Sequence, residues 1–133
     1  MALDVHLVTP EREVWAGPAQ MVIAHGTDGM VGILTGHAPL LIRLSIARMR
    51  IQLEDGRWMV AAVDGGFLHV AHQDDVTRVD ILAEHALLQD EVDREDPAAY
   101  EQRAEELRAE GRFDEARVEL AKAAVRRRVA QNG

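Results

Sequence analysis

The sequence predicts an antiparallel β-sandwich or flattened barrel followed by a helical hairpin. Short runs of alternating apolar and polar residues continue to about residue 82, and clusters of turn-forming residues separate them. Helical spacing of apolar residues begins only near residue 97. Composition changes in the same region, since eight of the ten glycines and all six histidines precede residue 90, while alanine is concentrated after it. The chain therefore divides into a β half and an α half.

Six segments of the first half alternate as half-buried strands do. In the third of them, Met49, Ile51 and Leu53 point to one side and the intervening polar residues point to the other. The sequence EDG that follows closes a hairpin onto the next strand. No helical pattern separates the segments, which favours antiparallel pairing. The expected strands are LDVHLVT (3–9), AQMVIAH (19–25), ARMRIQL (47–53), RWMVAAVD (57–64), GFLHVAH (66–72) and VTRVDIL (76–82).

The second half predicts two helices joined by a short turn. Asp96 is suited to cap the first helix, Pro97 fits its first turn, and Gly111 fits the position after its end. The second helix follows from Phe113. Because most of the apolar positions are alanine, we expect the hairpin to be weakly held and able to leave its resting place. The predicted organisation is a sandwich domain (1–85), a linker (86–95) and a helical hairpin (96–133).

Composition excludes several classes of function. A net charge of -8 argues against nucleic-acid binding, which needs a basic surface. The absence of cysteine excludes disulfides, thiol catalysis and zinc–thiolate sites. No apolar run approaches the length of a membrane span, and no signal peptide is visible, so we expect a soluble, cytoplasmic protein.

Five blocks of sequence in a fixed order resemble one known family. They are VTPEREVW, GTDGMVGILTGHAPLL, RIQLEDG, VDGGFLHV and VTRVDILAEHA, and an alanine-rich helical pair follows them. The chain resembles the epsilon subunit of the F-type ATP synthase, which is called delta in mitochondria. The resemblance implies a flattened ten-stranded β-sandwich with two C-terminal helices. It also implies a non-catalytic subunit of the central stalk, peripheral to the cytoplasmic face of a bacterial membrane, that couples rotation to ATP synthesis.

The resemblance also implies partners and contact residues. The expected partners are the gamma subunit, the ring of c subunits and, transiently, the beta subunits of the catalytic head. The loop GMVGILTGHAPL (29–40) turns sharply at a surface and is expected against the c ring and gamma, with Asp28, Met30 and His37 as candidate contacts. Position 30 is commonly acidic in the family, so Met30 favours an apolar contact.

The basic end of the second helix has two interpretations. It is either a solvated helix end that complements the helix dipole, or a surface that meets acidic loops of the beta subunits and restrains ATP hydrolysis. The candidate contacts of the second interpretation are Lys122, Arg126, Arg127 and Arg128.

No cofactor, metal or catalytic residue is predicted. Some bacterial relatives bind ATP through a motif like (I/L)DxxRA, which falls here on VDREDP (92–97), and Asp96 and Pro97 stand where arginine and alanine are required. His69 and the sequence VAHQDD (70–75) are interpreted as a strand end and an acidic turn rather than a metal site. Gly65 and Gly66 are expected to form a bulge or a turn. The alternative function is a free-standing ligand-binding sandwich with a helical dimerisation tail.

Overall fold

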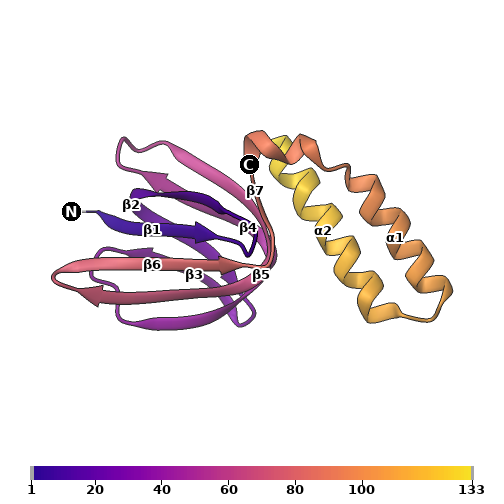
Figure 1. Cartoon of the computed structure of the whole chain (residues 1–133), viewed down its shortest axis with the longest axis horizontal. Helices are drawn as coiled ribbons and strands as arrows, with labels where there is room; N and C mark the ends of the chain where they lie inside the picture. Colours follow the sequence, from indigo (N-terminus) through magenta and orange to yellow (C-terminus); the bar gives the residue numbers. More distant parts are fainter. Residues whose placement is uncertain (1, 133) are drawn as a thin grey trace.

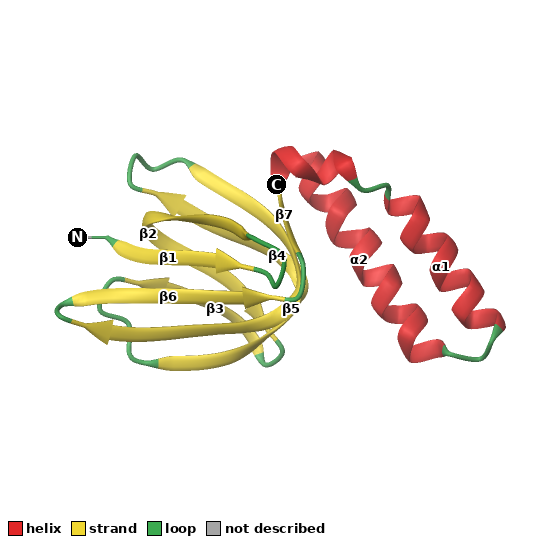
Figure 2. Cartoon of the chain, viewed as in Figure 1, coloured by secondary structure: helices red, strands yellow, loops and turns green. Residues whose placement is uncertain are grey.

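The computed structural model describes residues 2–132, which form a β-sandwich with a helical hairpin beside it (Figure 1). Strands occupy one half of the molecule and helices the other (Figure 2). The elements are β1 (Leu3–Val8), β2 (Glu13–Gly26), β3 (Gly29–Leu34), β4 (Leu40–Leu53), β5 (Trp58–Gln73), β6 (Val76–Ala83), β7 (Ala86–Leu88), the 3-10 helix η1 (Gln89–Arg94), α1 (Pro97–Ala109) and α2 (Phe113–Asn132). This order confirms the predicted fold class.

The strands form a sheet that closes on itself. Their order is β1-β6-β5-β4-β2-β3, and β1 also pairs with β2. The β1–β6 pairing is parallel, whereas β2–β3, β4–β5 and β5–β6 are antiparallel. A closed sheet of this kind is a flattened barrel whose two faces pack on each other, so the two descriptions left open by the sequence apply to the same object.

Three strands are much longer than the sequence pattern suggests. β2 and β4 each contain 14 residues and β5 contains 16. β5 pairs with β7 through residues 61–63 and with β6 through residues 66–73, so its two ends belong to different parts of the sheet. Register shifts also interrupt the β2–β4 pairing. When each long strand is counted as two segments, the seven strands of the described chain correspond to the expected ten.

The core lies between the two faces of the sheet. On β1, Leu3, Val5 and Leu7 are buried while Asp4 and His6 are only partly buried, as alternation requires. Of the residues predicted to point inward on β4, Met49 is buried but Leu53, at the end of the strand, is only partly buried. Other buried members of this core are Val22, Ile33, Ile51, Leu68, Val70 and Ile81.

Gly65 and Gly66 mark the point at which β5 changes partner. Their φ angles are +83° and +122°, which residues with a side chain rarely adopt. A Cβ atom on Gly66 would lie 2.1 Å from the carbonyl oxygen of Leu82 on the neighbouring strand. The pair therefore forms a kink inside one strand rather than a hairpin turn, and it lets β5 approach β6 closely.

The hairpin begins and ends at the predicted signals. The carboxylate of Asp96 accepts a hydrogen bond from the backbone N–H of Ala98 at 2.9 Å, and Pro97 is the first residue of α1. Gly111 has a φ angle of +77° in the turn between the helices. α2 packs against β4, β5 and η1, whereas α1 packs against α2. In this structure the hairpin is folded back onto the sandwich (Figure 1).

The segment between the halves is ordered. Residues 86–94, expected as a linker, form β7 and η1, and β7 pairs with β5. Arg12, in the loop after β1, donates from Nη1 and Nη2 to the carboxylate of Glu91 at 2.8 and 2.9 Å. This charge-assisted pair fastens η1 to the sandwich. The chain is thus fixed up to Arg94, and only residues 95–96 separate η1 from α1.

We expect Gly66→Ala to destabilise the sandwich by about 3 kcal/mol or more, because the added Cβ meets backbone atoms and the φ angle is unfavourable. Chemical denaturation followed by circular dichroism measures the change. Gly32→Ala is the matched control, since nothing lies within 4 Å of its added Cβ, and we expect a change within about 1 kcal/mol. Equal stability of the two variants would contradict the proposed role of the kink.

Candidate functional site

Arg126 is the centre of a buried ionic contact between the hairpin and the sandwich. It lies on α2 with an exposed fraction of 0%, and Asp64 on β5 is 4% exposed. The guanidinium donates to both carboxylate oxygens of Asp64, from Nη1 at 2.8 Å and from Nη2 at 2.6 Å. A bidentate pair fixes orientation as well as position. This pair therefore holds α2 in one register against β5.

Three further side chains complete the surroundings of Arg126. Its Nε donates to Glu95 Oε1 at 3.0 Å, and its guanidinium carbon lies 4.5 Å from the ring centre of Tyr100. The Tyr100 hydroxyl donates to the same oxygen of Glu95, and His85 Nε2 lies 2.7 Å from the other oxygen. Glu95 precedes α1 and Tyr100 belongs to it, so this cluster joins both helices and the segment before them to the sandwich.

The pKa shifts in the cluster favour a charged Glu95, a charged Arg126 and a neutral Tyr100. Burial alone raises the pKa of Glu95, but hydrogen bonds from Tyr100, His85 and Arg126 outweigh it and lower the pKa to about 2. Burial raises the pKa of Tyr100 to about 12, and its hydrogen bond to Glu95 adds to the shift. Burial opposes the charge of Arg126, yet the bonds to Asp64 overcome it and raise the pKa of the guanidinium. Arg126 is therefore charged and compensated although it is buried.

The other basic residues expected at the end of α2 are on the surface. Lys122 lies 3.7 Å from Glu119 of the same helix, and Arg127 donates to Glu101 of α1. Both contacts stay within the hairpin. Arg128 is exposed. Of the four basic residues predicted to act together, Arg126 alone is thus buried in a contact with the sandwich.

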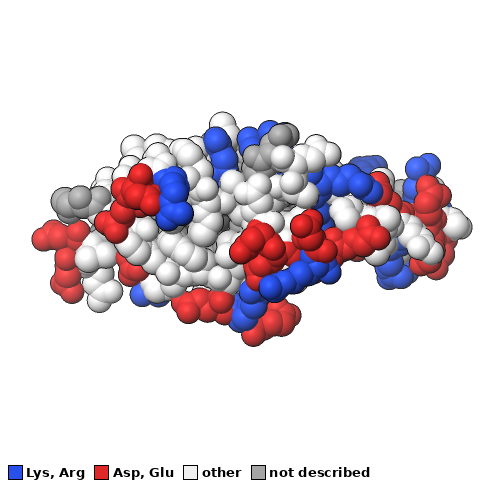
Figure 3. Space-filling view, turned by 90° about the horizontal axis from the view of Figure 1, so that it is seen from above, with Lys and Arg blue, Asp and Glu red and all other residues white. Residues whose placement is uncertain are grey.

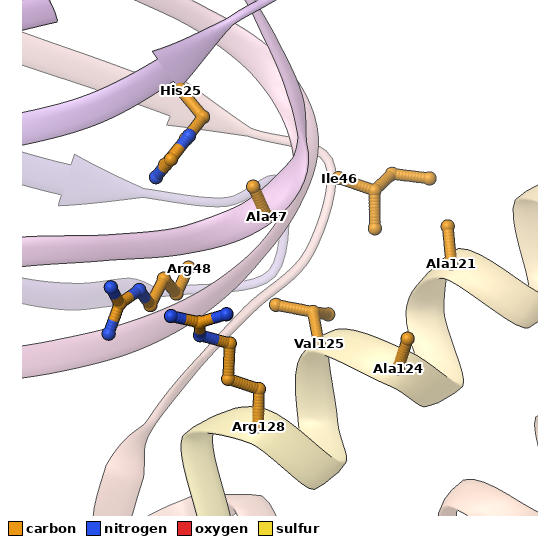
Figure 4. Close-up of a pocket in the computed structure, with 8 residues that line it drawn as sticks. All are labelled: His25, Ile46, Ala47, Arg48, Ala121, Ala124, Val125 and Arg128. Carbon is orange, nitrogen blue, oxygen red and sulfur yellow. The ribbon is translucent and has the colours of Figure 1, made fainter. Parts of the chain in front are cut away.

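A pocket of about 320 Å³ lies at the seam between α2 and the sandwich (Figure 4). Its apolar lining is Ile46, Ala47, Ala121, Ala124 and Val125, and His25, Arg48 and Arg128 complete it. The guanidinium groups of Arg48 and Arg128 approach each other across the seam (Figure 4). Burial lowers the pKa of Arg48, and repulsion by Arg128 lowers it further. The positive charges of Arg48 and Arg128 therefore repel each other across the seam.

The three residues expected to meet the c ring do not form one cluster. Asp28 and Met30 lie at the turn between β2 and β3, whereas His37 follows the far end of β3. Met30 is 67% exposed, which leaves a large apolar side chain in solvent. His37 is held in its own loop, because its Nδ1 lies 2.8 Å from the Ala38 carbonyl oxygen and its carbonyl oxygen contacts Nε2 of His72.

Sequence reasoning missed an exposed apolar strip formed by Leu41, Phe67 and Leu82. Their exposed fractions are 66%, 45% and 55%. Phe67 lies opposite Leu82 across the β5–β6 pairing and opposite Arg43 across the β4–β5 pairing, where the guanidinium carbon of Arg43 is 5.8 Å from the ring centre. A pocket of about 410 Å³ adjoins Phe67 and Leu82 and extends to Pro10. Contiguous apolar side chains on a sheet face are typical of a surface that binds another protein.

The structure holds few features of a ligand site. Within residues 2–132, no group of three or more His, Cys, Asp or Glu side chains is arranged to hold a metal ion. Asp96, at the position where the ATP motif requires arginine, caps α1 with its carboxylate. The absence of tight ATP binding stays a prediction. No helix among the described residues has both the length and the apolar character needed to cross a membrane.

Comparison with known proteins decides the family. Residues 2–89 match the model of the ATP synthase delta/epsilon chain β-sandwich domain. The chain belongs to the ATP synthase delta/epsilon family. The ATP synthase epsilon chain of Thermobifida fusca is 43% identical, over 90% of this chain and 95% of its own length. That of Corynebacterium diphtheriae is 38% identical, over 95% of both chains. The resemblance drawn from five sequence blocks is thereby confirmed, and so is the expected class, a subunit that is not itself an enzyme.

A solved structure has the same fold. The chain aligns with a TM-score of 0.73 and 21% identity to a chain in the cryo-EM structure of the mitochondrial ATP synthase of Euglena gracilis, covering 92% of this chain and 78% of that one. The family model ends at residue 89, so the hairpin lies beyond it, whereas Asp64 and His85 of the cluster lie within it.

Charge is distributed unevenly between the halves (Figure 3). In that view acidic and basic side chains intermingle over the hairpin, while much of the sandwich surface is uncharged. Sequence reasoning missed Asp64, His85, Glu95 and Tyr100 as members of the cluster. One signal was available, because Asp64 follows the apolar run MVAAV inside a strand, where an acid requires a partner.

We expect hairpin docking to depend on pH at both extremes. The lowered pKa of Glu95 stabilises the docked state above its ordinary value of 4.5, and this contribution is lost as pH falls through about 2. The raised pKa of Tyr100 stabilises it below the ordinary value of 10.0, and that contribution is lost as pH rises through about 12. Docking should therefore be most stable from about pH 4.5 to pH 10.

Tyr100 is the only tyrosine of the chain, so phenolate absorbance titrates it directly. We expect a midpoint near pH 12 in the native protein and near pH 10 in denaturant. Glu95→Gln should move the native midpoint towards 10, because it removes the negative charge that the hydroxyl faces. A native midpoint of 10 would show that Tyr100 does not belong to a buried anionic cluster.

Proposed function

We propose that this chain is the epsilon-type subunit of the central stalk of a proton-translocating ATP synthase. In this role it binds the gamma subunit and the c ring, transmits rotation between them, and contributes no catalytic residue. It is peripheral to the cytoplasmic face of a bacterial membrane and is held there through the complex. Support comes from its family and from relatives named ATP synthase epsilon chain that match nearly its whole length.

The exposed apolar strip is the observation that carries the proposed attachment. Leu41, Phe67 and Leu82 would lose contact with water against gamma, and each fully buried side chain of this size contributes about 1.5 to 3 kcal/mol. The sheet behind the strip is closed and rigid, so little ordering is needed on binding. A preformed apolar surface suits a permanent contact that must transmit torque.

The turn between β2 and β3 is our proposed contact with the c ring. Met30 projects into solvent there, and Asp28 stands beside it at the tip of the turn. Met30 stands where an acidic residue is common in the family, so this chain lacks that charge. Its exposed side chain supports an apolar contact instead. His37, at the other end of β3, is proposed to contact gamma or the ring from a separate loop.

We expect Phe67→Glu to reduce co-purification with a co-expressed gamma subunit by about tenfold or more, since it places a charge inside the apolar contact. Phe113→Glu is the matched control. Phe113 is the only other phenylalanine, it is 58% exposed at the start of α2, and its substitution should leave binding to gamma unchanged. Equal binding by all three proteins would remove the strip from the proposed interface.

The hairpin is proposed to restrain ATP hydrolysis by extending into the rotor's path. Lys122, Arg127 and Arg128 would then meet acidic loops of the beta subunits, with Arg126 joining them after release. The contact between Arg127 and Glu101 is exposed and that between Lys122 and Glu119 is partly buried, so both are less costly to exchange than the buried contact of Arg126.

Truncation after residue 95 tests the restraint directly. We expect the truncated chain to assemble, because the strip and the β2–β3 turn remain, and the purified complex to hydrolyse ATP faster than the complex with the full chain. Unchanged hydrolysis would exclude the restraint while leaving the structural role intact.

A further inference from the structure

Only Arg126, of the four basic residues expected to act on a partner, connects the hairpin to the sandwich. Lys122 and Arg127 pair within the hairpin, and Arg128 is exposed. Arg126 instead uses Nη1, Nη2 and Nε on the carboxylates of Asp64 and Glu95. Whatever moves the hairpin must break these contacts, whereas Lys122 and Arg127 keep their pairing partners when the hairpin moves.

The face that the hairpin covers is apolar around its single acid. The residues of the sandwich and η1 beneath α2 are Val60, Ala62, Leu87 and Val92, with Ile46 at their edge. While α2 is docked, Asp64 and Arg126 are both buried, so each charge depends on the other for compensation. Substituting one partner would leave the other charge buried and uncompensated, which is strongly unfavourable, whereas the loss of an exposed pair changes little.

Glu95 and Tyr100 extend the same contact to the other helix. Glu95 lies between η1 and α1, and it accepts from both Arg126 and the Tyr100 hydroxyl. Tyr100 also stacks on the guanidinium. When Arg126 leaves, Tyr100 loses the guanidinium against its ring. Because α1 packs against α2, the two helices are expected to detach together.

We propose that Asp64 and Glu95 are an internal acidic decoy for Arg126, which holds the hairpin docked until an acidic segment of a partner protein replaces them. This inference rests on the proposed function, and it names the residue that docking conceals. In the docked state Arg126 is the lock. In the released state the same guanidinium completes the basic end of α2. Release and the creation of the binding surface are then one event.

The docked state can be measured in the isolated full chain. The sequence contains no cysteine, so Glu54→Cys in the β4–β5 turn and Glu105→Cys on α1, both exposed, accept a pair of fluorescent labels for energy transfer. Asp64→Asn and Arg126→Gln each remove one side of the contact. Arg117→Gln, an exposed arginine of the same helix whose nearest carboxylate is 3.8 Å away, is the matched control.

We expect Asp64→Asn and Arg126→Gln each to raise the ratio of released to docked chain by about a hundredfold or more, and Arg117→Gln to change it less than about threefold. Docking that persists in both variants would overturn the lock. If Asp64→Asn unfolds the sandwich, as judged by its denaturation curve, Arg126→Gln decides alone, because Arg126 lies outside the sheet.

The decoy is tested in the assembled complex by ATP hydrolysis. Asp64→Asn frees an intact Arg126, so we expect stronger inhibition than in the wild type. Arg126→Gln also frees the hairpin but lacks the guanidinium, so we expect weaker inhibition than with Asp64→Asn. Equal inhibition by the two variants, at a level that differs from the wild type, would overturn the decoy. Release of the hairpin without any effect on hydrolysis would leave the lock standing and overturn the proposed restraint instead.

Discussion

The arrangement of the hairpin depends on the requirement that a buried guanidinium be compensated. Arg126 has lost its water, and Coulombic attraction in such a place is useful only if the partners lie at hydrogen-bonding distance. Asp64 supplies two acceptors on the rigid sheet, and Glu95 supplies a third. The packing of Val125 and Val129 beside them is non-directional, so it would tolerate sliding or rotation of α2. The ion pair removes that freedom.

The sheet makes this constraint effective because it holds Asp64 in place. The backbone N–H of Asp64 donates to the carbonyl oxygen of His85 at 2.9 Å, and the glycine kink follows immediately. On the other side of Glu95, the pair formed by Arg12 and Glu91 fixes η1. Both acids of the cluster are thus attached to a closed framework, while the guanidinium is carried by the part that can leave. The weak apolar stripe foreseen for the hairpin is compatible with this, since specificity comes from charge.

Local features were predictable from sequence, and long-range pairings were not. Alternation located strands, and the cap at Asp96 and the turn at Gly111 act within a few residues of themselves. The family followed from blocks of sequence that are contiguous. Arg126 is different, because its partner lies 62 residues away and its neighbours in RRR look equally suited to solvent. Arg126 lies between Val125 and Val129, which are both buried, and this position indicates that it too points inward. Only the tertiary fold shows which acid it contacts.

The kink at Gly65 and Gly66 also separates the two surfaces that the proposed function requires. Before it, Val60, Ala62 and Asp64 of β5 lie beneath the hairpin; after it, Phe67 belongs to the apolar strip beside β6. With strict alternation Phe67 would point inward with Ala61 and Val63, whereas after the kink Leu68 and Val70 point inward and Phe67 points outward. Since the kink redirects the strand and β6 closes against it, the strip keeps its shape whether or not α2 is docked. A subunit built this way can stay bound to a shaft through one half of β5 while the other half takes and releases its own helices.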